Sequence, residues 1–152
     1  MTLRRAVISD LQAVKDITST TISSIYPHYY PKGAVEFFLE HHCEQNIIND
    51  IKENCVYIYL DENTGPVGTV TIKKNEICRL FVLPEKQGMG FGKRMLDFAE
   101  DYILQRYKQI VLDASLPAKS IYQKRGYRVT ESNSIKVNYG DYLCYDVMRK
   151  YR

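Results

Sequence analysis

The chain has 152 residues, of which 45% are hydrophobic and 26% are charged. This length is sufficient for one hydrophobic core and the composition excludes a disordered or fibrous protein, so we expect a single domain over residues 1–152. The 21 basic and 18 acidic side chains give a net charge of +3, which is too small and too mixed for a typical nucleic-acid-binding surface.

The pattern of apolar residues and cysteines excludes further classes. No stretch reaches the roughly 18 apolar residues of a membrane span, and no apolar signal-peptide core follows residues 1–5, so we expect a cytoplasmic protein with no membrane partner. The four cysteines form no C-x-x-C pair. His41-His42-Cys43 points neighbouring side chains in different directions, so we expect no metal site.

The N-terminal third begins with a β-type run over residues 2–7. Ser9-x-x-Gln12 has the spacing of a capping box, which predicts the start of a helix. This helix directs four apolar residues inward: Leu11, Val14, Ile17 and Ile22. Two prolines in the aromatic segment 25–31 prevent the helix from continuing, so a loop separates it from a second helical region over about 34–53, within which breaks are allowed.

The middle third reads as a β-hairpin, because residues 55–60 and 67–73 are β-rich and 61–65 favour a turn. A third strand is expected over 76–83. A glycine-rich loop then precedes a helix over about 90–106, in which four residues recur at helical spacing: Met95, Ala99, Tyr102 and Ile103.

The C-terminal third predicts a strand over 109–113, a short helix over 117–124 that ends before Gly126, and a hairpin formed by 127–137 and 143–149 around a turn at 138–141. The resulting order is βααβββαβαββ. It predicts a mixed α/β (α+β) fold, with a mostly antiparallel central sheet flanked by helices and at least one parallel crossover at the long helix.

The loop Gln87-Gly88-Met89-Gly90-Phe91-Gly92 stands between a strand and a helix. Glycines at alternate positions let the backbone approach a ligand, and the helix adds N–H groups and the positive end of its dipole, so phosphate oxygens are suitable ligands. Only three residues separate Gly88 from Gly92-Lys93, where a P-loop needs four, and the spacing also differs from G-x-G-x-x-G. The glycines alone leave a tight turn without a ligand as an alternative.

The sequence around this loop carries a family resemblance. Residues 76–92 read Glu76-Ile77-x-Arg79-Leu80-Phe81-Val82-x-Pro84-x-x-Gln87-Gly88-x-Gly90-x-Gly92, and a later segment reads Tyr122-x-Lys124-x-Gly126-Tyr127. They resemble the [QR]-x-x-G-x-[GA] and Y-x-K-x-G-[FY] motifs of the GCN5-related N-acetyltransferase family, whose element order also agrees over essentially the whole chain.

The resemblance implies an enzyme that transfers an acetyl group from acetyl-CoA to a primary amine of a small molecule or peptide. The acetyl group would pass directly within a ternary complex, without a metal or a covalent acyl-enzyme. The alternative is a regulatory or interaction module that binds coenzyme A without turnover. Whether the protein forms a homodimer stays open at this stage.

The resemblance also implies a set of cofactor-binding residues. The backbone of Phe81, Val82 and Leu83 is expected to pair with the pantetheine arm, and an N–H near Val82 to polarise the thioester carbonyl. The pyrophosphate and its surroundings are assigned to residues of the loop and to two cations: Gln87, Gly88, Met89, Gly90, Phe91, Gly92, Lys93 and Lys124. Ser115 is expected to replace an asparagine that the family often has after the strand that corresponds to 109–113.

Two residues are candidates for proton transfer. Tyr122 aligns with a tyrosine that protonates the leaving thiolate in many members, and its reference pKa of ~10 lies near the ~8.5 of a thiol. Glu76 aligns with a glutamate that accepts the amine proton in some relatives, often through water. Arg79 is expected on the opposite face of the strand from Glu76. A core tyrosine and a strand carboxylate without a catalytic role remain the alternatives.

The acceptor site is assigned to the aromatic loop 25–31, because the loop at this place usually lines the acceptor site in this family. Its candidate residues are Tyr26, His28, Tyr29 and Tyr30. An aromatic wall could hold a cation or a flat substrate, and packing between helices explains the same residues equally well.

Overall fold

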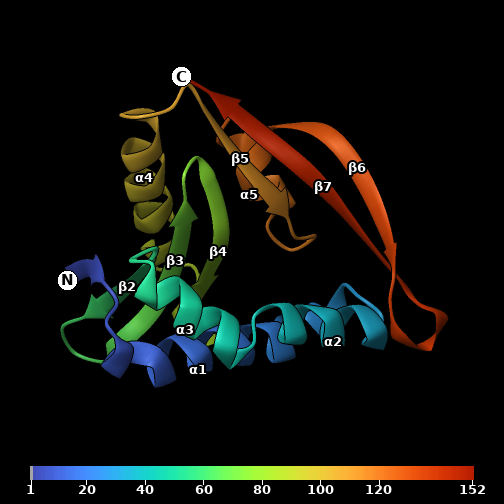
Figure 1. The fold of residues 1–152 in the computed structure, drawn as a ribbon, viewed down its shortest axis with the longest axis horizontal. Helices are drawn as coiled ribbons and strands as arrows, with labels where there is room; N and C mark the ends of the chain where they lie inside the picture. Colours follow the sequence, from blue (N-terminus) through green and yellow to red (C-terminus); the bar gives the residue numbers. More distant parts are fainter. Residues whose placement is uncertain (1) are drawn as a thin grey trace.

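The computed structural model describes residues 2–152, which contain one seven-stranded sheet in the order β1-β2-β3-β4-β5-β7-β6. The strands are β1 (Thr2–Arg5), β2 (Val56–Asp61), β3 (Gly65–Lys73), β4 (Glu76–Val82), β5 (Gln109–Ala114), β6 (Arg128–Lys136) and β7 (Tyr142–Tyr151). The helices are α1 (Leu11–Ile25), α2 (Lys32–His41), α3 (Glu44–Lys52), α4 (Phe91–Leu104) and α5 (Lys119–Lys124). The predicted mixed, mostly antiparallel fold is confirmed (Figure 1).

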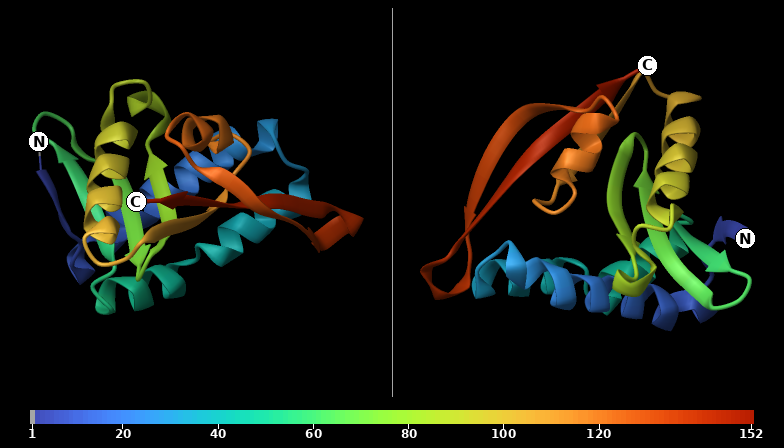
Figure 2. Two further views of the ribbon diagram at one scale, coloured as in Figure 1. Left: turned by 90° about the horizontal axis from the view of Figure 1, so that it is seen from above. Right: turned by 180° about the vertical axis from the view of Figure 1, so that it is seen from behind.

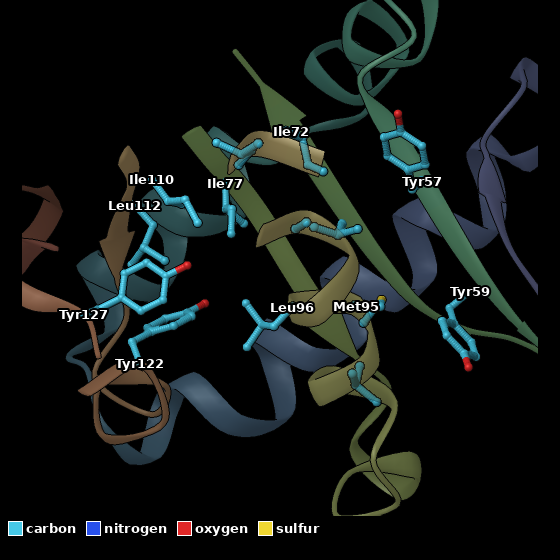
Figure 3. Close-up of a cluster of buried hydrophobic side chains, with 14 of the residues drawn as sticks. Tyr57, Tyr59, Ile72, Ile77, Met95, Leu96, Ile110, Leu112, Tyr122 and Tyr127 are labelled. Carbon is cyan, nitrogen blue, oxygen red and sulfur yellow. The ribbon is translucent and has the colours of Figure 1, made fainter. Parts of the chain in front are cut away.

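Helices cover both faces of the sheet. On one face, α1, α2 and α3 lie side by side below the strands, and on the other α4 and α5 pack against them (Figures 1 and 2). The buried face of α4 carries Met95, Ala99 and Ile103, three of the four residues predicted from helical spacing, while Tyr102 is only partly buried at its edge. Figure 3 shows this core, with Tyr122 and Tyr127 beside α4.

Two details of the N-terminal half bear on the predictions. The helical region expected over 34–53, within which breaks were allowed, is interrupted at residues 42 and 43 and forms two helices. The prediction of a capping box at Ser9 and Gln12 is wrong. Asp10 lies at the N-terminus of α1 and accepts a hydrogen bond from the backbone N–H of Val7 (2.8 Å). The Gln12 side chain instead donates a hydrogen bond to Asp16, one turn further along α1.

Strands β4 and β5 form the only parallel pair of the described sheet, and α4 connects them as predicted. They pair at two positions only, Glu76 with Val111 and Ile77 with Leu112. Beyond these positions β4 continues to Val82 without β5 beside it. The two strands therefore diverge in the middle of the sheet, as Figure 2 shows.

A β-bulge lies in β4 close to this divergence. Thr71 of β3 pairs with Arg79, whereas the next residue of β3, Ile72, pairs with Ile77. Cys78 is therefore an extra residue between them. A bulge of this kind reverses the alternation of side chains along the strand.

The bulge changes the relation between Glu76 and Arg79. Lys73 pairs with Glu76 and Thr71 pairs with Arg79. Since Lys73 and Thr71 are two residues apart on a regular strand, all four side chains lie on one face of the sheet. The expectation that Glu76 and Arg79 lie on opposite faces is wrong, because it assumed an unbroken strand.

The β6–β7 hairpin reaches across the molecule to α2 (Figure 1). At its tip, Asp141 accepts a hydrogen bond from the backbone N–H of Gly33 (3.0 Å), and the Tyr139 hydroxyl donates to Glu36 (2.9 Å). A Cβ atom on Gly33 would lie 2.2 Å from the carbonyl oxygen of Asn138, so only glycine allows this approach. The hairpin is thereby fixed against the helical layer.

Candidate active site

A cleft of about 640 Å³ lies where β4 and β5 diverge. Its lining comes from the helical layer of α2 and α3, from β4, from the segment that follows β5, and from α5. Glu76 and Tyr122, the two candidates for proton transfer, both line this cleft, although they are 46 positions apart in the chain. Tyr26 and Ser115 line it as well.

Tyr122 is buried on α5 and packs edge-on against Tyr127, with ring centroids 5.5 Å apart. Its hydroxyl has no hydrogen-bond partner within residues 2–152 and is available to a ligand in the cleft. Burial, and secondarily the proximity of Tyr26, raise the pKa of Tyr122 well above its usual value. The hydroxyl is therefore protonated at neutral pH and acts as a donor.

Glu76 is partly buried at the start of β4. Burial and the negative charge of Asp113 raise the pKa of Glu76, and Lys73 partly opposes this. A carboxylate with a raised pKa is a stronger base than an ordinary one and accepts a proton more readily. Asp113, the last residue but one of β5, carries no motif that would have identified it from the sequence.

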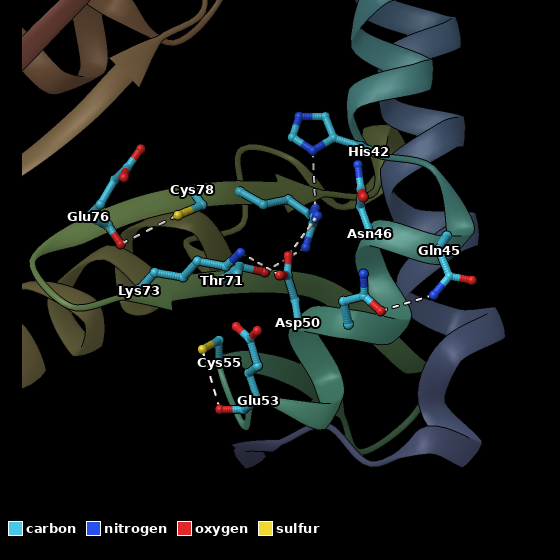
Figure 4. A network of polar contacts seen from close by, with 12 residues as sticks. His42, Gln45, Asn46, Asp50, Glu53, Cys55, Thr71, Lys73, Glu76 and Cys78 are labelled. Carbon is cyan, nitrogen blue, oxygen red and sulfur yellow. Dashed lines mark hydrogen bonds and ion pairs between the residues drawn. The ribbon is translucent and has the colours of Figure 1, made fainter.

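Arg79 is held by a polar network on the same face of β4. Its guanidinium donates to Asp50 (3.2 Å), to the Thr71 hydroxyl (2.8 Å) and to Nδ1 of His42 (3.2 Å). Figure 4 shows Asp50 between this network and Lys73, whose Nζ lies 2.6 Å from Asp50 Oδ1. Arg79 therefore joins β4 to α3, and the prediction that it does not neutralise Glu76 agrees with these contacts.

His42 lies in the break between α2 and α3 and lines the cleft. Burial, followed by the charges of Arg79 and His41, lowers the pKa of His42 to about 3. The imidazole is therefore neutral. Because Nδ1 accepts from Arg79, Nε2 carries the proton. The sequence motif His41-His42-Cys43 did not predict this role.

The end of β4 has a backbone edge that β5 does not cover. The N–H of Leu83 donates to Val67 on β3 (2.9 Å), so the N–H of Val82 points to the opposite edge. The Val82 carbonyl accepts from the Thr21 hydroxyl (3.2 Å) and from the Gln87 side chain (3.1 Å). The Val82 N–H therefore faces the space between the diverging strands.

The glycine loop follows a 3₁₀ turn over Pro84–Lys86 and leads into α4. Gly88 and Gly90 have φ values of 78° and 88°, in the left-handed region that favours glycine. Gly90 occupies the N-cap of α4, and no side chain caps the helix there. The N–H groups of the first turn of α4 are consequently left for a ligand.

The loop residues divide into backbone and side-chain contributors. Gln87 supports the end of β4, and Met89 is exposed. The Phe91 side chain is buried and packs edge-on against Tyr59, so only its backbone can contact a ligand. A Cβ atom on Gly92 would lie 3.7 Å from Val82, an ordinary contact, so Gly92 is not required for space.

Two of the basic residues around the loop are paired with carboxylates of α4. Lys93 is exposed and pairs with Asp97 (2.8 Å). Arg125 bonds to Asp97 (2.7 Å) and Glu100 (2.8 Å), so it fixes the end of α5 to α4. Lys124 is exposed on α5.

The four aromatic-loop candidates lie in different environments. Tyr26 lines the cleft, and burial raises its pKa to about 12, although interaction with the Ser115 hydroxyl opposes the rise. Tyr30 is buried, and its hydroxyl accepts a hydrogen bond from the N–H of Leu116 (2.7 Å). His28 and Tyr29 are exposed and do not line the cleft.

Residues 2–152 contain neither a membrane-spanning helix nor a cluster of metal-binding side chains. No helix in this part of the chain combines the length and apolar character needed to cross a membrane. Within the same residues, no group of three or more histidine, cysteine, aspartate or glutamate side chains is arranged to hold a metal ion.

Comparison with known proteins gave one family match. A protein-family model described as an acetyltransferase (GNAT) domain matches residues 25–143. These residues include the β4 strand, the glycine loop, α5 and most of the cleft lining. A search of curated proteins gave no match.

Solved structures share the fold at low sequence identity. A GCN5-related N-acetyltransferase of Rhodopseudomonas palustris is 23% identical, with a TM-score of 0.88 over 99% of this chain and 95% of that one. PaiA N-acetyltransferase of Thermoplasma acidophilum, solved with coenzyme A, is 20% identical, with a TM-score of 0.76 over 99% and 98%. Salmonella typhimurium YncA, solved with its cofactor acetyl-CoA, is 18% identical, with a TM-score of 0.73 over 99% and 93%.

Proposed function

Since the chain belongs to the GNAT acetyltransferase family, we propose that it transfers an acetyl group from acetyl-CoA to a primary amine, by direct attack within a ternary complex. The observation that carries this proposal is the presence of Glu76 and Tyr122 in one cleft, at the divergence of β4 and β5. A module that only binds coenzyme A has no need of a base and a hydroxyl donor in the same cleft.

The coenzyme is assigned to the diverging strands and the glycine loop. Two solved structures of this fold contain coenzyme A or acetyl-CoA. In this chain, Gly88 and Gly90 and the uncapped first turn of α4 supply N–H groups for the pyrophosphate. The uncovered edge of β4 supplies main-chain groups for the pantetheine arm, which would pair with β4 in place of β5.

The proposed chemistry uses three groups of the protein. Acetyl-CoA supplies the thioester, whose C–S bond breaks as a new C–N bond forms to the acceptor nitrogen. Glu76 takes the proton that the nitrogen loses, directly or through water. The Val82 N–H donates to the carbonyl oxygen as negative charge develops on it, and Tyr122 donates to the departing sulfur.

The environment of Tyr122 sharpens its role. Burial raises the pKa of Tyr122 above that of an ordinary tyrosine. Proton transfer from Tyr122 to a thiolate, whose thiol has a pKa of ~8.5, is therefore more unfavourable than the reference pKa values imply. Tyr122 therefore stabilises the thiolate chiefly as a hydrogen-bond donor. Full transfer takes place only when burial of the sulfur raises the thiol pKa as well.

Steady-state assays of thiol release test the proposed function. Purified protein with acetyl-CoA should release free thiol only when an amine acceptor is added. Glu76→Gln should lower kcat/KM by about 10²-fold or more, the range expected for loss of a general base. Glu40→Gln, at an exposed position of α2 outside the cleft, is the matched control and should keep wild-type activity. Amine-independent thiol release would contradict the proposal.

A further inference from the structure

Among the charged residues that line the cleft, negative charges outnumber positive charges. Two of these residues are cationic, Lys73 and Arg79, and both are bound to the same carboxylate, Asp50, at 2.6 Å and 3.2 Å. Three further carboxylates line the cleft and form no ion pair within residues 2–152: Glu53, Glu76 and Asp113. The side chains that line the cleft therefore carry an excess of negative charge.

Two of these carboxylates share one face of the sheet. Glu76 pairs with Val111, and Asp113 follows Val111 by two residues on the same strand, so both side chains point to the same side. Standard strand dimensions place the two Cα atoms about 8 Å apart. This separation leaves room for two cationic groups of one small molecule.

Protein cations compensate these two side chains only in part. Burial and the charge of Asp113 raise the pKa of Glu76, and Lys73, which is bound to Asp50, partly opposes this. Burial raises the pKa of Asp113 and Glu131 adds to the rise, while His41 opposes it. Arg149 projects from the same face near Val111, but its guanidinium donates to Thr130 and Gln109 instead.

The opposite wall of the cleft is aromatic. Tyr26, Phe37 and Phe38 line it from α2 and the segment before α2. Aromatic faces attract cations and pack against methylene groups. The cleft thus combines separated negative charges with an apolar wall between the helices and the sheet.

We infer that the preferred acceptor is a short diamine: one nitrogen lies at Glu76 and reacts, while the second, as an ammonium group, binds Asp113. This inference rests on the proposed function, because Glu76 is taken to face the reacting nitrogen. A monoamine leaves Asp113 unpaired, and an amino acid of the same length presents a carboxylate to it. Affinity should therefore fall in the order diamine, monoamine, amino acid.

Calorimetry on the protein saturated with coenzyme A, which carries no acetyl group and permits no turnover, measures this order. The probes are 1,4-diaminobutane, butylamine and 4-aminobutanoate, which have similar length and differ in the charge of one end. The diamine should bind about tenfold more tightly than butylamine, the gain expected from one charge-assisted hydrogen bond in a partly buried site. The amino acid should bind more weakly than butylamine.

Asp113→Asn should bring the affinity for the diamine close to that for butylamine, and it should weaken binding of the diamine more than binding of butylamine. Asp101→Asn, at an exposed position of α4 outside the cleft, is the matched control and should keep the tenfold preference. Equal binding of diamine and monoamine by the wild type, no binding of either, or a preference that survives in Asp113→Asn would each overturn the inference.

Thiol release with the same three acceptors separates this inference from the proposed function. Turnover with no diamine preference in binding or in kcat/KM would leave an acetyltransferase and remove the diamine assignment. Selective, Asp113-dependent binding of the diamine without thiol release would leave the acceptor selectivity of the cleft standing and contradict the proposed reaction.

Discussion

Tyr122 and Tyr127 pack against each other (Figure 3). The Tyr122 side chain lines the cleft, whereas the Tyr127 hydroxyl is buried and has no hydrogen-bond partner within the described residues. Removing the two hydroxyls one at a time therefore separates a catalytic effect from a packing effect at nearly the same place.

Tyr122→Phe should lower kcat by about 10²-fold, the lower range for loss of an acid–base group, and change the affinity for acetyl-CoA little. Tyr127→Phe should keep kcat and leave the free energy of unfolding unchanged or higher, because it removes an unsatisfied buried hydroxyl. Stopped-flow thiol release and thermal unfolding of both variants check this. An unchanged kcat in Tyr122→Phe would assign the donor elsewhere.

His42 is held neutral in the folded protein, with a pKa lowered to about 3. In the unfolded chain the side chain titrates near 6.5, so between these values the unfolded state binds the extra proton. Stability is therefore lost as pH falls below about 6.5. Between pH 7.5 and pH 5.5 this residue should cost roughly 1 kcal/mol of unfolding free energy.

His42→Asn removes the titrating group and keeps an oxygen acceptor for Arg79, so its urea midpoint should fall less than that of the wild type between these two pH values. His28→Asn, at an exposed position, is the matched control and should keep the wild-type pH dependence. If His42→Asn loses as much stability as the wild type over this range, the imidazole is not buried in its neutral form.

Among single residues, Glu76 and Tyr122 could be predicted as site residues from the family motifs, but the residues around them could not. The bulge at Cys78, which places Arg79 on the face of Glu76, depends on pairing with β3 and leaves no mark in the order of residues. Asp113 and His42 stand in no recognised motif, and elements distant in the chain bring them into the cleft.

Among the elements, the glycine loop is the one whose conformation followed most closely from its sequence. Alternate glycines between a strand and a helix predicted a backbone that only glycine adopts readily, and Gly88 and Gly90 have positive φ values. Gly92 differs, because it lies in the first turn of α4 with space for a methyl group. The family motif likewise accepts alanine at the position of Gly92.

Gly90→Ala should weaken acetyl-CoA binding by about tenfold, because alanine disfavours a φ of 88° and the N–H groups of the loop would move. Calorimetry measures this. Gly92→Ala should bind within about twofold of the wild type. Gly65→Ala, at a φ of 80° in the first residue of β3, should lose as much stability as Gly90→Ala but keep the affinity for acetyl-CoA. Wild-type affinity in Gly90→Ala would contradict the proposed pyrophosphate site.

Element boundaries were less predictable where tertiary contacts decide them. The break at His42 separates α2 from α3, and there the side chain turns to meet Arg79 on β4. Neither residue 42 nor residue 43 is a proline or a glycine, so local sequence contains no signal to end a helix.

For the whole molecule, the order of strands and helices was enough to predict the mixed fold and the parallel crossover through α4. It was not enough to predict the cleft. The cleft exists because β4 and β5 pair at only two positions and because the β6–β7 hairpin is anchored on α2 by Gly33 and Asp141. Both features depend on contacts between segments far apart in sequence.

In the proposed reaction, one cleft brings an amine to a thioester held along β4, and no acyl group becomes attached to the protein. Acetyl-CoA labelled with ¹³C at the acetyl carbonyl tests it directly, because NMR distinguishes a thioester from an amide. With protein and 1,4-diaminobutane, the thioester signal should be replaced by an amide signal on the diamine, and without an acceptor it should persist. Label on the protein, or a thioester that persists with every amine offered, would contradict the account.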